Sequence, residues 1–150
     1  MKMSFLSFWA SKSIDRTLSN VLSLGMKFER LVQLARNLII YDDIELRCRH
    51  FAFVLNKNKI VSIGKNSKKS HPINQKYGYF DGSGLHAEAC AVIKSGRIDH
   101  TKHTLVTFRI DRNDKIAMGK PCKYCQKLLK DVAFKEIFYS NEQGEFERSK

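Results

Sequence analysis

Two short stretches of this sequence carry side chains that bind metal ions. His86-Ala87-Glu88 supplies an imidazole and a carboxylate, and Pro121-Cys122-Lys123-Tyr124-Cys125 supplies two thiols. Zinc in proteins prefers nitrogen and thiolate ligands in a tetrahedron, and a catalytic zinc site leaves one corner open for water. His86, Cys122 and Cys125 make three such ligands, so these residues predict a zinc ion in an open, three-ligand site.

The local sequence also predicts how these groups face one ion. Two cysteines separated by two residues lie nearly one helical turn apart, so both sulfurs can face the ion if a helix opens at Cys122. Pro121 favours that placement because proline fits the first turn of a helix, and the helix dipole favours both thiolates. Glu88 lies two residues after His86. A carboxylate there can take a proton from a water that zinc has acidified and pass it to a leaving group.

These motifs resemble the signature of the cytidine deaminase superfamily, H-x-E followed by P-C-x-x-C. Here they are HAEAC from His86 to Cys90 and PCKYC from Pro121 to Cys125, in the order that the family has. The resemblance implies a three-layer α/β/α fold around a five-stranded mixed sheet, a zinc cofactor, and Glu88 as the proton shuttle. It also implies that the backbone N–H of Ala87 and the carbonyl of Lys120 touch the base.

Two alternatives to a catalytic site remain open at this point. The ligands could form a structural Cys/His zinc knuckle, or they could be unrelated core residues. Cys90 raises a related doubt, because it follows His86 by four residues and could face the same way on a helix. If Cys90 closed the tetrahedron, the zinc would be structural. A buried free cysteine, however, commonly behaves as a small apolar residue.

Polar and aromatic residues outside the two motifs are candidates for substrate contacts. Asn66 follows a predicted strand, where members of the family often carry an asparagine that binds the sugar or base; an ordinary turn asparagine is an equal alternative. Tyr77, Tyr79 and Phe80 precede His86. One of them, with Phe80 as our candidate, could stack on a base, while loop aromatics packed on the core are the alternative.

A lysine-rich segment leads into the first motif. No acidic residue lies between Glu45 and Asp81, whereas lysines recur throughout that stretch. A run of charge is usually only a solvated face, but this one is expected to border the pocket. We therefore take Lys68 and Lys69 as candidates for contacts with a substrate phosphate, and Arg109 as a further one.

The elements expected to hold these residues alternate between strands and helices. Apolar residues recur at helical spacing from Met26 to about Tyr41, and β-favouring runs bounded by turn residues predict strands. The order predicts a sheet with helices packed on it. In chain order we expect a helix at 26–41, a strand hairpin at 49–55 and 59–63, a long polar loop at 64–84, a helix at 87–94, a strand at 104–110, a charged connection at 111–120, a helix at 122–132 and strands at 137–140 and 145–148.

Length and composition predict one globular domain. The chain has 150 residues, of which 43% are hydrophobic and 28% charged, so we expect an N-terminal extension at 1–25 and a deaminase domain at 26–150. Cys48 and Cys90 do not make the dense disulfide framework of a small secreted protein, which favours a reducing, cytoplasmic location. The first ten residues lack a convincing secretion signal, and no segment is apolar for long enough to span a bilayer.

The net charge of +12 predicts attraction to an anionic partner such as nucleotide phosphates, nucleic acid or an acidic surface. One hypothesis is a deaminase of a phosphorylated cytidine or deoxycytidine nucleotide, forming a homo-oligomer as the family commonly does. The alternative is a deaminase of cytosine or adenine within single-stranded DNA or RNA, which the net charge favours. The apparent hairpin joining the last two strands is more like free-cytidine deaminases. A zinc-stabilised binding module is a third class, and the presence of Glu88 argues against it.

Overall fold

The computed structural model describes residues 25, 27–40, 49–80 and 82–150 of the chain. The chain divides into two compact units, Met1–Asn37 and Leu38–Lys150, and each is described by itself. Residues 27–40 are helical, as the apolar spacing predicted, and Leu31, Val32 and Ala35 on that helix are buried. The predicted extension at 1–25 lies outside the described residues except for Gly25. None of the helices in the described part of the chain has the length and apolar character that a membrane span needs.

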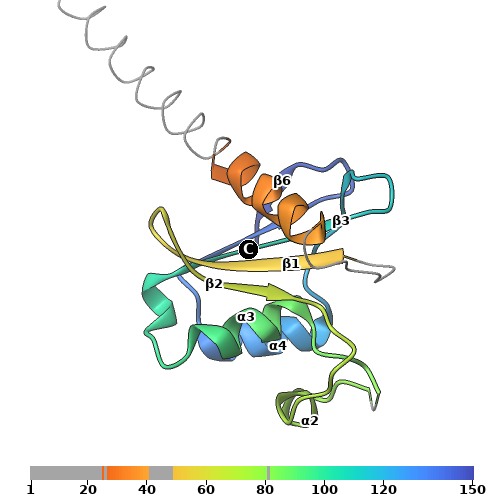
Figure 1. Ribbon diagram of the computed structural model, residues 1–150. Helices are drawn as coiled ribbons and strands as arrows, with labels where there is room; N and C mark the ends of the chain where they lie inside the picture. Colours follow the sequence, from red (N-terminus) through yellow and green to blue (C-terminus); the bar gives the residue numbers. More distant parts are fainter. Residues whose placement is uncertain (1–24, 26, 41–48, 81) are drawn as a thin grey trace, which may run out of the picture. The chain divides into compact units, whose positions relative to one another are not determined.

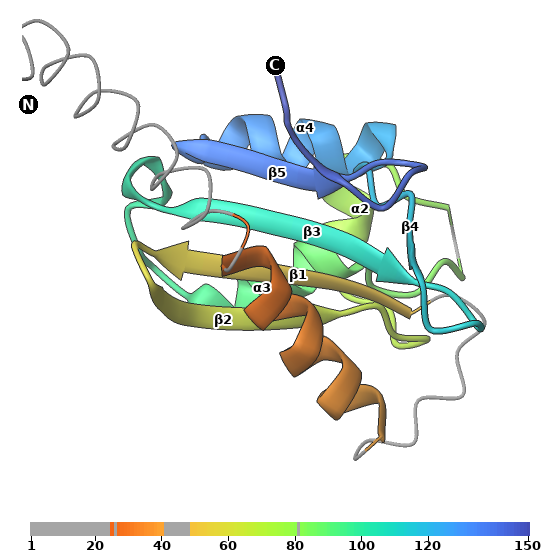
Figure 2. The ribbon, with the colours of Figure 1, turned by 90° about the horizontal axis from the view of Figure 1, so that it is seen from above.

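A mixed β-sheet organises the second unit, as the order of elements predicted (Figure 2). The strands are hydrogen-bonded in the order β2-β1-β3-β5-β6, and β4 pairs with β3 beside that path. The β3–β5 pair is parallel and the other pairs are antiparallel. The strands are β1 (Arg49–Asn56), β2 (Lys59–Lys65), β3 (Thr104–Ile110), β4 (Ile116–Ala117), β5 (Glu136–Ser140) and β6 (Phe146–Arg148).

The expected count of five strands is wrong, because a short sixth strand forms in the connection at 111–120. Asp111 follows the last residue of β3 and stabilises a turn. Its carboxylate accepts the backbone N–H groups of Asn113 and Lys115 at 2.8 and 3.0 Å. Asp114 takes a left-handed conformation in the same turn, with φ of 64°. Ile116 and Ala117 then pair with the end of β3. An aspartate that accepts nearby backbone N–H groups is a common turn device.

The predicted hairpin is confirmed, with both strands longer than expected. Asn56 pairs with Lys59, so a two-residue turn joins β1 to β2, and Lys57 in that turn has φ of 55°. The second strand continues to Lys65, which brings Asn66 to its end. The buried run Phe51–Leu55 makes β1 a central strand with no exposed face.

Two helices, α3 (Ala87–Ser95) and α4 (Lys123–Val132), cover the same face of the sheet (Figure 1). Small residues allow α3 to approach the sheet closely, because Ala87, Ala89 and Ala91 are all fully buried. The core between the helices and the sheet includes Ala52, Val54, Ala87, Ala91, Leu105 and Leu129. Gly96 ends α3 with φ of 70°, as its place after the apolar run predicted. The first residues of both helices belong to the two metal-binding motifs.

Gly64 sets the distance between β2 and α3. A Cβ atom at this position would overlap the carbonyl oxygen of Ala87 and the backbone nitrogen of Ala91. The Ser62 hydroxyl, also on β2, donates to the carbonyl oxygen of Ala91 at 2.7 Å, which joins strand and helix at the same place.

We therefore expect Gly64→Ala to lower the free energy of unfolding by about 1–3 kcal/mol, because α3 must move outward to accept the methyl group. Denaturant-induced unfolding measures the loss. Gly25→Ala is the control, since a Cβ there would meet no atom within 4 Å. Equal stability of the two variants would contradict the close approach.

The long loop expected at 64–84 is not structureless. It contains a short helix, α2 (Ile73–Tyr77), which Pro72 precedes and which ends at Gly78 with φ of 78°. Proline at a helix start and glycine just past its end are the usual signals for such a turn of helix. This helix was not predicted, because the surrounding residues are polar and the helix is short.

Candidate active site

His86, Cys122 and Cys125 come together as a potential metal-binding group. Their ligand atoms all lie within 4.8 Å of one another, and no other His, Cys, Asp or Glu of the described residues joins them. Nδ1 of His86 is 3.6 Å from the sulfur of each cysteine. Zn–S bonds of about 2.3 Å and Zn–N bonds of about 2.0–2.1 Å in a tetrahedron place sulfur and nitrogen about 3.5–3.6 Å apart. The residues therefore fit a tetrahedral zinc ion.

The start of each helix positions these ligands. His86 is the N-cap residue of α3 and Cys122 is the N-cap residue of α4, both with extended backbone conformations. The Cys122 sulfur accepts the backbone N–H of Cys125 at 3.5 Å, which folds the motif around it. Pro121 lies one residue before this N-cap, so its predicted place within the first helical turn is wrong. The N-terminus of α4 thus directs backbone N–H groups toward the Cys122 sulfur.

The pKa values of the two thiols are shifted in opposite directions. The hydrogen bond from the Cys125 side chain lowers the pKa of Cys122 to about 3, and His86 and nearby backbone N–H groups act in the same direction. The pKa of Cys125 is raised, first by that contact with Cys122 and then by burial. The Cys122 thiolate also raises the pKa of His86 through its hydrogen bond. A cation must displace the remaining protons of the cluster, since zinc binds thiolate sulfur and neutral imidazole.

Glu88 lies beside the cluster with its two carboxylate oxygens in different surroundings. Oε2 is 3.5 Å from the Cys125 sulfur. Oε1 accepts the Thr107 hydroxyl at 3.3 Å and lies 3.6 Å from Nε2 of His50. The residue is only 1% exposed, so these partners, rather than solvent, fix the carboxylate.

Tyr79 is buried behind the cluster, so the alternative of an aromatic residue packed in the core applies to it. Its hydroxyl is 2.7 Å from the Cys125 sulfur, and its ring packs edge-on against His86 with centroids 4.8 Å apart. Burial is the main cause that raises the pKa of Tyr79, followed by the contact with Cys125. Tyr79 therefore contacts one of the candidate ligands directly through its hydroxyl. Tyr77 is half-buried on α2, and burial and a hydrogen bond to Asp131 raise its pKa.

Cys90 stays out of the cluster. It lies on α3, where its backbone N–H donates to the carbonyl oxygen of His86 in the first helical turn. Its side chain is half-buried and free. A closed site with four protein ligands is therefore not formed by the described residues.

The candidate base and sugar contacts occupy three places. Ala87 is the first residue of α3 and is buried, whereas Lys120 is exposed just before Pro121, with its ammonium group 5.9 Å from the ring centre of Tyr139. Asn66 lies at the end of β2 and its Oδ1 accepts the backbone N–H of His50 at 2.9 Å. Asn66 thus has a structural partner, and its role toward a substrate remains a prediction.

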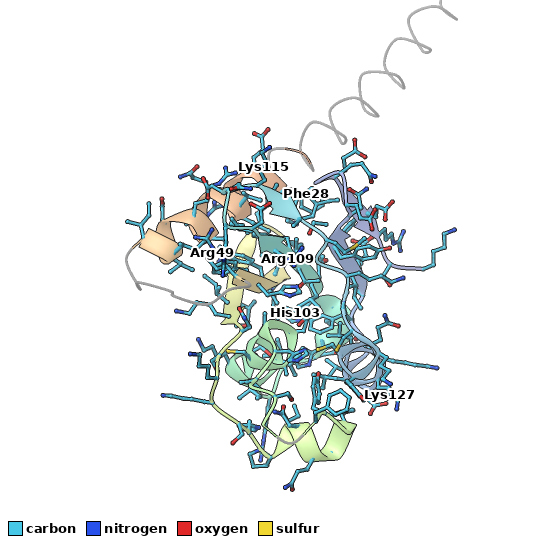
Figure 3. The ribbon with its side chains drawn as sticks, turned by 90° about the vertical axis from the view of Figure 1, so that its right-hand side faces the viewer. Phe28, Arg49, His103, Arg109, Lys115 and Lys127 are labelled. Carbon is cyan, nitrogen blue, oxygen red and sulfur yellow. The ribbon has the colours of Figure 1, made fainter. Side chains whose placement is uncertain are left out.

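The candidate phosphate and stacking residues lie in the same unit as the cluster. Lys68 and Lys69 are exposed on a segment that is fixed beside Leu85 by two backbone hydrogen bonds of 3.0 and 2.9 Å. Phe80 is 72% exposed and its ring meets that of Tyr124 edge-on. Arg109, on β3, is paired with His50 in the sheet register and faces the same side; Figure 3 shows it together with Arg49 from the neighbouring strand.

A cavity of about 1080 Å³ lies over α4, β5 and β6 rather than over the cluster. Of the predicted site residues, all of which the structure describes, only Lys120 lines it. The cavity therefore adjoins the second motif, but neither Cys122 nor Cys125 lines it. The geometry of the candidate metal ligands indicates the chemistry of the site better than this cavity does.

Two residues of the site, His50 and Thr107, were missed by the motif argument. No neighbouring residue marks either of them as functional in the sequence. They meet Glu88 only because β1 and β3 pair in a particular register. His86, Cys122, Cys125 and Glu88 themselves have the arrangement that the resemblance to the cytidine deaminase superfamily implies: one histidine and two cysteines at two helix starts, and a glutamate beside them.

No model of a protein family and no curated protein matches the sequence. Among solved structures, the apo form of dCMP deaminase from the cyanophage S-TIM5 is 22% identical, with a TM-score of 0.42 over 62% of this chain and 66% of its own. The same enzyme in complex with dCMP and dUMP is 20% identical, with a TM-score of 0.48 over 76% and 82% of the two chains. This chain thus spans slightly less than two thirds of the apo structure.

Proposed function

We propose that this chain is a zinc-dependent hydrolytic deaminase acting on the cytosine of a phosphorylated cytidine or deoxycytidine nucleotide. The observation that carries the proposal is the buried Glu88 carboxylate beside three metal-ligating atoms, with Oε2 3.5 Å from the Cys125 sulfur. His86, Cys122 and Cys125 would hold the metal. Zinc there would act as a Lewis acid that makes water a nucleophile at neutral pH.

Glu88 would carry protons between water and the base. It first accepts a proton from the attacking water and donates it to the ring nitrogen N3, as the new C–O bond forms at C4. It then takes the second proton of that water and passes it to the amino group. The C4–N bond breaks, ammonia leaves and uracil forms, so cytosine and water are fully converted and the carboxylate is restored.

A phosphate on the substrate is supported by the placement of Lys68 and Lys69. Their segment is hydrogen-bonded to Leu85, one residue before His86, so the backbone that carries these two exposed lysines is anchored next to the first candidate ligand. A free nucleotide is also supported by the C-terminal strands. Residues 141–144 form a tight turn between β5 and β6, with Asn141 Oδ1 accepting two backbone N–H groups, and no helix intervenes.

A deamination panel followed by mass spectrometry tests the proposal. The zinc-loaded full chain is incubated with cytidine, CMP, dCMP, adenine nucleotides and short single strands. We expect ammonia and a uracil nucleotide from CMP or dCMP, with a lower KM than for cytidine. Lys68→Gln/Lys69→Gln should raise the KM for the monophosphate but not for cytidine, whereas the exposed Lys94→Gln on α3 should change neither.

Two outcomes would contradict the proposal. Absence of any deamination by a protein with stoichiometric zinc would exclude the reaction. Turnover of single strands alone, with binding that weakens steeply as salt rises, would identify a polynucleotide substrate instead.

A further inference from the structure

Three side chains from three different elements form a hydrogen-bonded series that ends on Glu88. Nε2 of His50, on β1, is 3.1 Å from the Thr107 hydroxyl oxygen. That hydroxyl, on β3, lies 3.3 Å from Oε1 of Glu88 and donates to it. His50 Nε2 is also 3.6 Å from the same carboxylate oxygen. Neither His50 nor Thr107 belongs to the two motifs.

The donors of this series can be assigned by counting hydrogens. A threonine hydroxyl has one hydrogen and can accept others. Because Thr107 gives its hydrogen to Glu88, the contact with His50 requires the hydrogen to be on Nε2 of the imidazole. A ring that carries a hydrogen on Nε2 therefore completes the series.

Hydrogen bonds with Asn66 hold the backbone of His50 in place. Asn66 brackets His50, since its Oδ1 accepts the His50 N–H at 2.9 Å and its own N–H donates to the His50 carbonyl at 3.3 Å. Thr107 is fully buried, and the His50 side chain is 23% exposed. His50 and Thr107 also belong to the paired part of β1 and β3, so neither can shift without disturbing the centre of the sheet.

We propose that His50 and Thr107 are positioning residues for the proton carrier of the site. They occupy Oε1 of Glu88 and thereby leave Oε2 directed at the Cys125 side, where the reacting groups would lie. The proposal rests on the proposed function of Glu88, and it assigns no proton transfer to His50 itself. It predicts that the orientation of the carboxylate, and not the binding of substrate, depends on this series.

Kinetics of matched variants test the proposal, using the full chain with its metal content measured in each case. His50→Phe and Thr107→Val should lower kcat by about 10- to 100-fold with zinc retained, as for other partners of catalytic groups, while KM changes little. His50→Gln keeps an N–H near the Nε2 position, and Thr107→Ser keeps the hydroxyl, so both should recover most of the loss. The double variant His50→Phe/Thr107→Val should be no slower than the slower single variant, because one break already interrupts the series.

Three results would each overturn the proposal. They are losses in kcat that multiply in the double variant, an effect on KM alone, and a His50→Gln variant as slow as His50→Phe. A second measurement does not depend on turnover: long-range ¹H–¹⁵N NMR of the imidazole. We expect the Nε2–H tautomer in the wild type and a mixture of tautomers in Thr107→Val. The Nδ1–H tautomer in the wild type would refute the series. If the wild type deaminates nothing, the proposed function fails, while the tautomer still decides the His50 contact.

Discussion

Glu88→Gln is expected to lower kcat for cytosine deamination by about 10²–10⁴-fold, the usual contribution of a general acid–base group. The amide keeps the size of the carboxylate and can still accept the Thr107 hydroxyl through its oxygen. It cannot take up a proton and release it again, which the proposed reaction requires twice. Because Glu88 is not one of the three ligand residues, the metal content should be unchanged.

The measurement combines ammonia release from CMP or dCMP with metal analysis of the same sample. Glu142→Gln, which removes an exposed carboxylate from the turn between β5 and β6, is the control for loss of one negative charge. It should keep full activity. A Glu88→Gln protein that retains both zinc and the wild-type rate would rule out the proton-carrier role.

The grouping of His86, Cys122 and Cys125 was predictable from the sequence because its geometry is mostly local. Cys122 and Cys125 are held by one helical turn, and His86 opens the helix that also carries Glu88. Helix starts and strand hairpins depend on neighbouring residues, and these predictions agree with the structure to within a few positions. The two elements that were not predicted, α2 and β4, are short and lie in polar segments. Turn residues rather than apolar periodicity determine the conformation there.

The surroundings of Glu88 could not be predicted in the same way. His50 and Thr107 are 57 residues apart in sequence, and they meet through the register of an antiparallel strand pair. A shift of that register by one residue would turn each side chain to the other face of the sheet. Tyr79 shows the same limit: packing on the core was one of the two interpretations of its place before His86, but nothing in the sequence predicted that its hydroxyl would lie 2.7 Å from the Cys125 sulfur.

Cys125→Ala is expected to abolish stoichiometric zinc binding, whereas Cys90→Ala should retain it. Both residues are free cysteines in or beside the motifs, but only Cys125 belongs to the ligand group. A ligand that stabilises the native state raises the melting temperature with its concentration. Zinc should therefore raise the Tm of the wild type and of Cys90→Ala but not that of Cys125→Ala. Metal analysis and thermal unfolding with and without zinc measure both effects. Loss of zinc from Cys90→Ala would mean that four protein ligands close the site, and the metal would then be structural rather than catalytic.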